Sequence, residues 1–395
     1  MIKVGIIGVG TIAASHIEAY RKNPDVEIYA FCDIDKKRLE EMGEKYGVTR
    51  LFTDKDEMLK LSEIDAVSVC TWNSAHAECS IAALNAGKNV LCEKPMAMNA
   101  KEAEEMKAAA DKNGKLLMIG FVRRYGNDCK VIEDFINMGY FGDIYYSKAQ
   151  YLRRNGNPGG WFGDKSRSGG GPLIDLGVHV IDLVRYLLGN PKPVSVYGTT
   201  FQKLFDRKGA IGAPKYLSQS ATDNDICDVE DLASALIRFD NGAVLSVEAA
   251  FSLNIEKGVG TIELFGTKAG AKIDPEVKLF SQEENYLTNV SFDAPTALSF
   301  SGLFEGEINH FVDCINGKAK CKSPAEDGIE IMKILDAIYE SSRTGHEVSL
   351  NDQYLRRFKN INSPSACVKI LVNTRVFPAF LPCRNKNLLF LNSAT

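Results

Sequence analysis

The sequence predicts an α/β protein made of two domains. We expect an N-terminal Rossmann doubly wound parallel sheet, followed by a C-terminal α+β domain with a large, mostly antiparallel open sheet. Strand and helix patterns alternate along the first third of the 395 residues, which is typical of a parallel sheet with helices on both faces. From about Tyr145 long alternating strands succeed one another instead, which indicates an antiparallel sheet.

These patterns place the first domain at residues 1–122 and the second at residues 123–352. The remaining residues, 353–395, contain no acidic side chain. They form an atypical tail, which we interpret either as a segment that binds a partner or as a poorly ordered extension.

The first element is a strand that runs directly into a glycine turn. Residues 1–7 are largely apolar, GVGTIA follows at residues 8–13, and residues 11–21 have a helical pattern. Gly8 permits the tight turn, and Gly10 leaves room for a pyrophosphate to approach the backbone. The N–H groups at the start of the helix, around Thr11 and Ile12, favour a negative charge. An ordinary strand-to-helix turn can contain the same glycines, so the next elements decide between the two interpretations.

The second strand, residues 27–32, ends at Asp33, where dinucleotide-binding folds carry an acidic residue. Its carboxylate would accept hydrogen bonds from both hydroxyls of the adenosine ribose and would repel a 2′-phosphate. Ile34, not an arginine, comes next. Strand, turn, helix, second strand and aspartate therefore stand in the order of a dinucleotide site, and the predicted cofactor is NAD, preferred over NADP.

The later elements continue both patterns. In the first domain we predict helices at 36–46, 75–86 and 100–113 and strands at 66–70, 89–92 and 116–120. In the second we predict strands at 145–152, 194–201, 232–239, 243–250 and 260–265 and helices at 172–188, 304–316 and 325–342. Asn241-Gly242 separates two of these strands and is a strong hairpin signal.

Composition and charge agree with a soluble enzyme. A formal net charge of −4 gives no electrostatic basis for binding nucleic acid. No run of about eighteen apolar residues suggests a membrane helix, and no secretory signal precedes the first strand, so we expect a cytoplasmic protein. The ten cysteines are scattered without a CxxC pair. They indicate reduced thiols, and we predict no metal site.

Two motifs carry candidate catalytic groups. Lys94, between Glu93 and Pro95, directly follows a strand at the sheet edge where such folds bind their ligand. GGGPLIDLGVH ends at His179 and places Asp175 four residues before it, on one face of the predicted helix. The helix dipole favours a carboxylate at Asp175, and His179 titrates near neutral pH, as a general base should. The alternatives are a surface lysine, a capping aspartate and a core histidine.

Four segments together resemble the Gfo/Idh/MocA oxidoreductases, the group of glucose–fructose oxidoreductase and inositol dehydrogenase. They are GIIGVGTIAASH, AALNAGKNVLCEKPMA, GFVRRY and GGGPLIDLGVHVIDLVRYLLG. The resemblance covers about residues 1–350 and implies a Rossmann domain plus a mostly antiparallel domain that assembles homodimers or homotetramers. It also implies that Lys94, Asp175 and His179 are the catalytic trio.

The resemblance further implies contacts with the cofactor beyond the glycine turn and Asp33. These contacts fall on Thr71, Trp72, Asn73, His76, Glu93 and Lys94. The family usually has Thr-Pro where this chain has Thr71-Trp72-Asn73, so the details of this loop depart from the family pattern.

Candidate substrate contacts are Arg124, with Arg123 as its alternative, and Trp161 in the loop 153–161, together with Asp175 and His179. The ring of Trp161 can lie on the apolar face of a sugar or cyclitol, or it can anchor its loop on the second domain.

We therefore expect an NAD-dependent dehydrogenase that acts on a secondary hydroxyl of a cyclic polyol, sugar or sugar derivative, similar to inositol dehydrogenase. A glycoside 3-dehydrogenase is the alternative substrate class, and a catalytically silent dinucleotide-binding regulator is the alternative of another class. In the enzyme His179 removes the hydroxyl proton, Lys94 stabilises the alkoxide and Asp175 orients the ring. Which of Lys94 and His179 takes the proton stays open.

Overall fold

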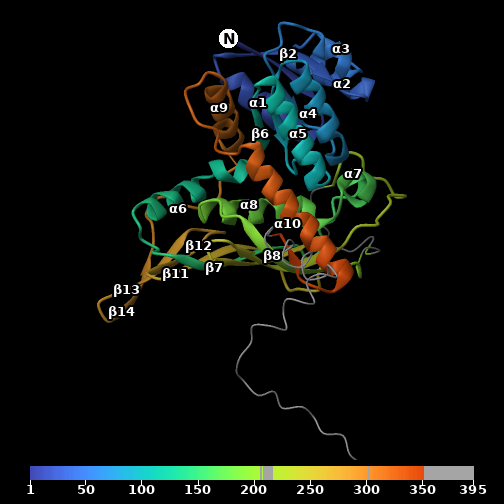
Figure 1. Ribbon diagram of the computed structural model, residues 1–395. Coiled ribbons are helices and arrows are strands. Elements are labelled where there is room, and N and C mark those ends of the chain that lie inside the picture. Colours follow the sequence, from blue (N-terminus) through green and yellow to red (C-terminus); the bar gives the residue numbers. More distant parts are fainter. Residues whose placement is uncertain (205–206, 208–216, 301, 351–395) are drawn as a thin grey trace, which may run out of the picture. The chain divides into compact units, whose positions relative to one another are not determined.

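A computed structural model describes residues 1–204, 207, 217–300 and 302–350 (Figure 1). The predicted tail at residues 353–395 lies outside these described residues. None of the described helices combines the length and apolar character that crossing a membrane requires.

The first sheet has six strands in the order β3-β2-β1-β4-β5-β6, all parallel. Because the chain moves outward from β1 in one direction and then restarts at β4 in the other, the two half-sheets meet where such folds bind ligands. The strands are β1 Ile2–Ile7, β2 Val26–Cys32, β3 Leu51–Phe52, β4 Ala66–Val69, β5 Asn89–Glu93 and β6 Leu117–Gly120. The helices are α1 Thr11–Lys22, α2 Lys36–Tyr46, α3 Lys55–Leu59, α4 His76–Asn85 and α5 Ala100–Asn113.

Caps fix the bounds of two helices that the sequence predicted to the residue. The Asp35 side chain accepts a hydrogen bond from the backbone of α2, and Asn99 does the same for α5. Gly47 and Gly114 end these helices in the left-handed conformation, with φ of 72° and 59°, which glycine adopts without steric cost.

The second sheet has nine strands in the order β14-β13-β12-β11-β7-β10-β9-β8-β15. Its pairs are antiparallel except for β7 and β10, which run parallel. Asn241-Gly242 joins β9 to β10 in an antiparallel pair, so the predicted hairpin is confirmed. The strands are β7 Ile144–Leu152, β8 Pro193–Phe201, β9 Leu232–Phe239, β10 Val244–Ala250, β11 Val259–Gly266, β12 Ala269–Lys272, β13 Lys278–Glu283, β14 Tyr286–Val290 and β15 Val348–Ser349.

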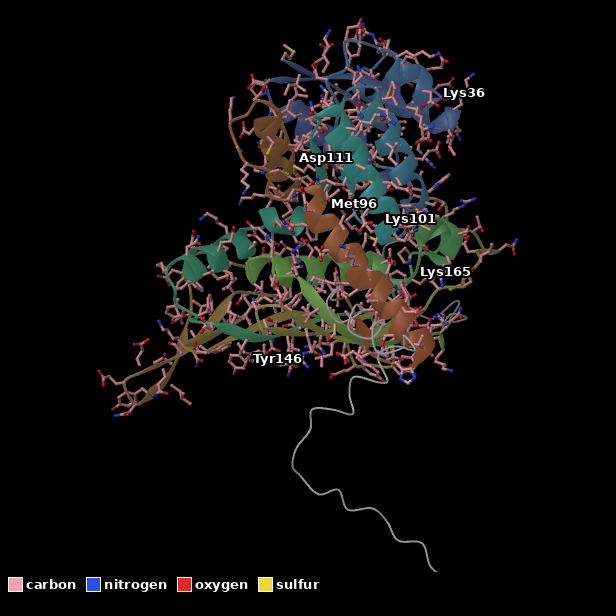
Figure 2. All side chains as sticks on the ribbon, in the orientation of Figure 1. Lys36, Met96, Lys101, Asp111, Tyr146 and Lys165 are labelled. Atoms are coloured by element: carbon pink, nitrogen blue, oxygen red, sulfur yellow. The ribbon has the colours of Figure 1, made fainter. Side chains whose placement is uncertain are left out.

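Helices cover one face of this sheet. Figure 1 shows α6, α8 and α10 on the same side of it, while Figure 2 places Tyr146 on the opposite side. Along β9 the burial alternates, with Ile237 buried and Leu236 exposed. The helices are α6 Asn127–Asn137, α7 Lys165–Ser168, α8 Val178–Leu187, α9 Leu303–Ile315 and α10 Ala325–Thr344. The predicted fold class is confirmed: a parallel sheet of Rossmann order precedes a mostly antiparallel sheet with one face free of described helices.

Candidate active site

A cavity of about 980 Å³ opens at the carboxyl ends of β1, β2 and β4. Of the predicted cofactor contacts, Gly8, Gly10, Thr11, Ile12, Asp33, Thr71 and Trp72 line it, as does the predicted substrate contact Trp161. Asn73, His76, Glu93 and the catalytic trio are not part of its wall.

The glycine turn has the geometry that a dinucleotide requires. Gly8 has a φ of +82°, and a Cβ there would stand 2.7 Å from the carbonyl oxygen of Cys70, so no other residue fits. A Cβ on Gly10 would meet nothing within 4 Å. Because no side chain caps the first turn of α1, its N–H groups remain available to a phosphate. These features fit the pyrophosphate of NAD.

Asp33 is oriented by the backbone. Its Oδ2 accepts a hydrogen bond from Val9 N at 2.8 Å, and its Oδ1 accepts one from Asp35 N at 2.9 Å. Each oxygen retains a lone pair for a ribose hydroxyl. Arg38, which the sequence analysis did not select, lines the same cavity and pairs with Asp35 at 3.5 Å.

His76 connects the cavity wall to the segment of Lys94, the predicted catalytic lysine. Its Nδ1 lies 2.7 Å from the carbonyl oxygen of Pro95, and its Nε2 lies 3.1 Å from that of Thr71. Burial lowers the pKa of His76, although both carbonyls favour the charged ring. Thr71 lines the cavity and Pro95 follows Lys94, so this buried ring sets the position of the lysine relative to the cofactor site.

The structure brings Lys94 and Asp175 together. Lys94 follows β5, and its Nζ donates hydrogen bonds to the carbonyl oxygen of Asp175 at 3.1 Å and to Oδ1 at 3.2 Å. Both side chains retain slightly under a fifth of their exposure. Asp175 lies in a π-helical turn, Leu173–Gly177, where the sequence analysis predicted regular α-helix. The Lys94–Pro95 peptide bond is cis.

His179 stands in a positively charged, desolvated setting. Burial lowers its pKa well below the usual value, and the charges of Lys94, Arg123 and Arg153 lower it further. The expectation that His179 titrates near neutral pH is therefore corrected, because its imidazole stays unprotonated in mildly acidic solution. A neutral imidazole is the form that accepts a proton.

Two residues beneath Lys94 were missed by the sequence analysis. His16 Nε2 lies 2.8 Å from Glu93 Oε1, and Glu307 on α9 lies in the same buried group. Burial tends to raise the pKa of Glu93, but His16 and Lys94 lower it overall. Burial, and then the charge of Glu93, raise the pKa of Glu307 well above its usual value. The two pKa values are thus shifted in opposite directions, which favours the charged form of Glu93 and the neutral form of Glu307. No local sequence signal joins residues so far apart.

The loop at residues 71–73, whose sequence departs from the family pattern, contacts the second domain. Trp72 lies under the guanidinium of Arg167, 5.1 Å from the ring centre, and Asn73 Nδ2 donates a hydrogen bond to Ser168 O at 2.7 Å. Trp161 stacks on Phe162, with ring centres 4.0 Å apart.

Arg124 is not brought to this cavity. Its side chain has no exposed surface and donates to Asp182, with distances of 3.0 and 2.6 Å, and to Asp327 at 2.8 Å. The sequence analysis mistook an internal ion pair for a substrate contact, because sequence alone does not show which arginine is buried. Arg123 is also paired, with Asp128 and Asp274, but its charge reaches His179.

The fold and this site define a Rossmann-type oxidoreductase. Residues 2–121 match the description "Oxidoreductase family, NAD-binding Rossmann fold", and residues 134–350 match "Oxidoreductase family, C-terminal alpha/beta domain". The chain belongs to this family, the Gfo/Idh/MocA oxidoreductases, and the earlier resemblance is confirmed.

Two of the three relatives described next cover most of the chain, and the third covers about half of it. The D-glucoside 3-dehydrogenase of Escherichia coli strain K12 is 36% identical over 353 residues, which cover 88% of this chain and 97% of that protein. The myo-inositol 2-dehydrogenase of Thermotoga maritima is 33% identical over 189 residues, covering 48% and 55%. The solved aldose-aldose oxidoreductase of Caulobacter crescentus, complexed with glycerol, is 25% identical with a TM-score of 0.73, covering 88% of this chain and 99% of that one.

The buried position of Arg124 predicts a large effect on stability. We expect Arg124→Met to lower the free energy of unfolding by about 3–5 kcal/mol, because it leaves buried carboxylates without their partner. Urea denaturation measures this loss. Arg343→Met is the matched control, since within the described residues Arg343 forms an exposed ion pair with Glu340 alone, and its loss should leave the midpoint nearly unchanged. Equal effects of the two substitutions would contradict the assignment.

Proposed function

We propose that the chain is an NAD-dependent oxidoreductase that moves hydride between the nicotinamide and a secondary hydroxyl of a sugar, cyclic polyol or sugar derivative. The contact between Lys94 and Asp175, with His179 in the same charged setting, carries this proposal. The E. coli D-glucoside 3-dehydrogenase, similar over nearly its full length, favours a glycoside 3-dehydrogenase, while an inositol dehydrogenase is the second candidate.

The bound NAD would supply the hydride acceptor, held by Gly8, Gly10, Thr11, Ile12 and Asp33. Two N–H groups of Lys94 are used by Asp175, so the third can bind the substrate oxygen and stabilise its developing negative charge.

His179 and Asp175 divide the remaining tasks. A neutral ring nitrogen of His179 takes the hydroxyl proton, which its lowered pKa permits at neutral pH. Asp175 binds Lys94 through Oδ1, which leaves Oδ2 as an acceptor for a neighbouring hydroxyl, so that the carboxylate orients the sugar ring.

We also propose that the chain divides into a first domain at residues 1–122 and a second at residues 123–352. We propose further that the nicotinamide end of the cofactor site is formed by Thr71, Trp72, Asn73, His76 and Glu93. We propose that the protein is located in the cytoplasm, a reducing compartment. The eight described cysteines, which are all free, support this location.

The silent-regulator alternative predicts cofactor binding without turnover. A regulator has no need of a lysine held against an aspartate beside a desolvated histidine, so the retained trio disfavours it. Binding of NAD by the wild type, with no oxidation in a panel of glucosides, hexoses, inositols and uronates, would support the regulator instead.

Removing either proposed catalytic side chain should abolish most turnover. Lys94→Ala and His179→Ala should each lower kcat by about 10²–10⁴-fold on a substrate found in that panel. NAD affinity and thermal stability should change little, since neither side chain lines the cofactor cavity. Reduced-nicotinamide absorbance gives the rate. Lys101→Ala removes an exposed lysine of α5 and serves as the control; wild-type rates in the two site variants would refute the mechanism.

The pH profile should report the lowered pKa of His179. Since the neutral ring is the base, kcat/KM for oxidation should be level above about pH 6.5 and fall only in more acid solution. Arg153→Met removes one of the positive charges that lower this pKa, so the acid limb should move to higher pH. A wild-type inflection at or above neutrality, or an unmoved limb in the variant, would count against this assignment.

Cofactor preference should follow Asp33. Its carboxylate repels a 2′-phosphate, and the nearby Arg38 is paired with Asp35, so kcat/KM should be higher with NAD than with NADP. Asp33→Ser combined with Ile34→Arg should shift the ratio toward NADP, whereas Ile34→Arg alone should shift it less. Equal or better efficiency of the wild type with NADP would overturn the preference.

We propose a homodimer or homotetramer that buries the outer face of the nine-stranded sheet. Tyr197 and Leu236 are paired across β8 and β9 and are 54% and 44% exposed there. Light scattering of the full chain at micromolar concentration should give a multiple of the monomer mass, and Leu236→Glu should weaken the association. Met138→Glu, on the exposed residue that follows α6, is the control. A monomeric wild type would disprove the assembly.

A further inference from the structure

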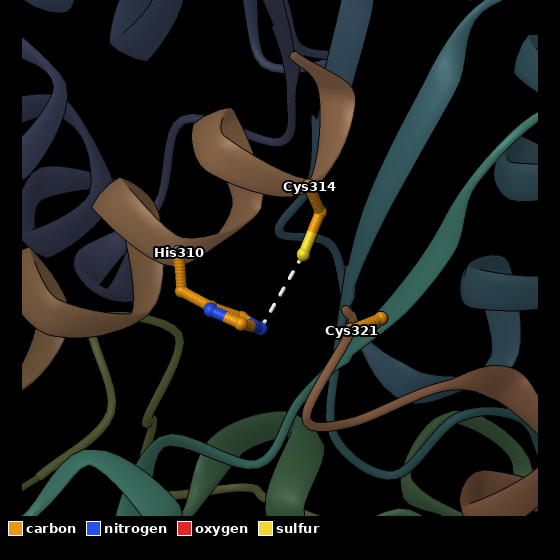
Figure 3. A group of neighbouring side chains, drawn as sticks. All are labelled: His310, Cys314 and Cys321. Carbon is orange, nitrogen blue, oxygen red and sulfur yellow. Dashed lines mark hydrogen bonds between the residues drawn. The ribbon is translucent and has the colours of Figure 1, made fainter. Parts of the chain in front are cut away.

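His310, Cys314 and Cys321 form a compact group away from the proposed active site (Figure 3). Each offers one ligand atom, and these atoms all lie within 4.8 Å of one another. The Nε2 of His310 and the Sγ of Cys314 are 3.3 Å apart. All three side chains are half-buried, so a solute can reach them without unfolding the chain.

The local fold holds these side chains together. His310 and Cys314 are one turn apart on the same face of α9, as Figure 3 shows. After α9 the chain reverses at Gly317, which has a φ of 69°, and Lys318 N donates a hydrogen bond to Asp313 O at 2.8 Å. Ile119 N then binds Ser323 O at 2.9 Å, which fixes the segment of Cys321 against β6.

We propose that His310, Cys314 and Cys321 are the three protein ligands of a site for a thiophilic divalent cation, for which zinc is the expected occupant. A tetrahedral zinc, with bonds of about 2.3 Å to sulfur and about 2.0 Å to nitrogen, holds neighbouring ligand atoms about 3.5–3.8 Å apart. The observed 3.3 Å between Nε2 and Sγ and the 4.8 Å limit on the group bracket these values. The ligand atoms therefore need to move by about 1 Å or less relative to one another to reach this geometry.

The charges of the group also suit zinc. His310 Nε2 accepts a hydrogen bond from Lys322 N, so this nitrogen carries the lone pair that a metal would take. A bound metal deprotonates its thiol ligands, so Cys314 and Cys321 would bind it as thiolates. Two thiolates neutralise one Zn²⁺, so the nearby ammonium of Lys322 faces no net positive charge.

One contact opposes binding. Lys322 N donates a hydrogen bond to His310 Nε2 at 2.9 Å, and the metal must replace this donor. A second cavity is lined in part by Gly306, Lys322 and Tyr125, and the ring of Tyr125 packs against that of His310. Because Lys322 itself lines this cavity, its displaced amide would have a route to water there.

The cation would link the end of α9 to the segment that leads into α10. That segment includes Lys322, whose carbonyl oxygen accepts a hydrogen bond from Arg124. The proposed role is therefore a structural link, independent of the hydride transfer proposed above.

Metal analysis of the full chain tests the site. We expect about one zinc per chain after purification with a thiol reductant and removal of loose metal, and a visible spectrum of tetrahedral, thiolate-bound cobalt after exchange with Co²⁺. Cys314→Ser, Cys321→Ser and His310→Gln should each lose most of the zinc and this spectrum. After removal of bound metal with a chelator, added Zn²⁺ should raise the melting temperature of the wild type but not of the variants.

Matched controls assign the metal to these residues. Cys227→Ser changes a half-exposed cysteine elsewhere in the fold, and Cys367→Ser with Cys383→Ser removes the two cysteines outside the described residues. Both proteins should keep the zinc and the cobalt spectrum. A wild type without zinc and without cobalt binding, zinc retained in the ligand variants, or a Cys314–Cys321 disulfide that persists in the thiol reductant and is found by mass spectrometry would each overturn the proposal.

Discussion

The buried guanidinium of Arg124 holds the two halves of the described chain in one alignment. It follows β6 of the parallel sheet, and it binds Asp182 on α8 and Asp327 on α10, while Arg185 completes the network by binding Asp327 at 2.8 Å. Buried charges tolerate little displacement, because an unpaired charge in the interior costs several kcal/mol. Asp182 lies one turn beyond His179, so this network sets where the proposed base stands relative to the sheet that carries Lys94.

The same positive charges serve two purposes at the site. The proposed role of Lys94 is to stabilise an alkoxide, and with Arg123 and Arg153 it also lowers the pKa of His179. Because these positive charges keep the imidazole unprotonated at neutral pH, it is free to accept a proton from a substrate hydroxyl. The same charges would stabilise the alkoxide that forms beside it. The buried carboxylate of Glu93 then balances part of this charge, with His16 as its hydrogen-bond partner, while Glu307 stays neutral.

The sequence predicted those elements whose causes are local. Asp35 and Asn99 cap their helices through bonds within a few residues, and the alternation of β9 is visible in its letters. The short β3 and the exposed hairpin of β13 and β14 lack such signals, and they were missed. The burial of Arg124 depends on contacts with α8 and α10, which lie far along the chain. Periodicity encodes neither these contacts nor the π-helical turn at Asp175.

The loop that departs from its family pattern shows how the two domains share the cofactor site. Trp72 and Asn73 reach Arg167 and Ser168 of the second domain, and Trp161 lines the same cavity as the glycine turn. A cofactor in this cavity therefore contacts both domains, and its binding free energy helps to hold them in register. Because Trp161 is already part of that wall and stacks on Phe162, its position favours enclosing the cofactor over forming a platform for the sugar. We propose that the sugar ring is selected instead by Asp175, which binds Lys94, and by Arg153, whose charge acts on His179.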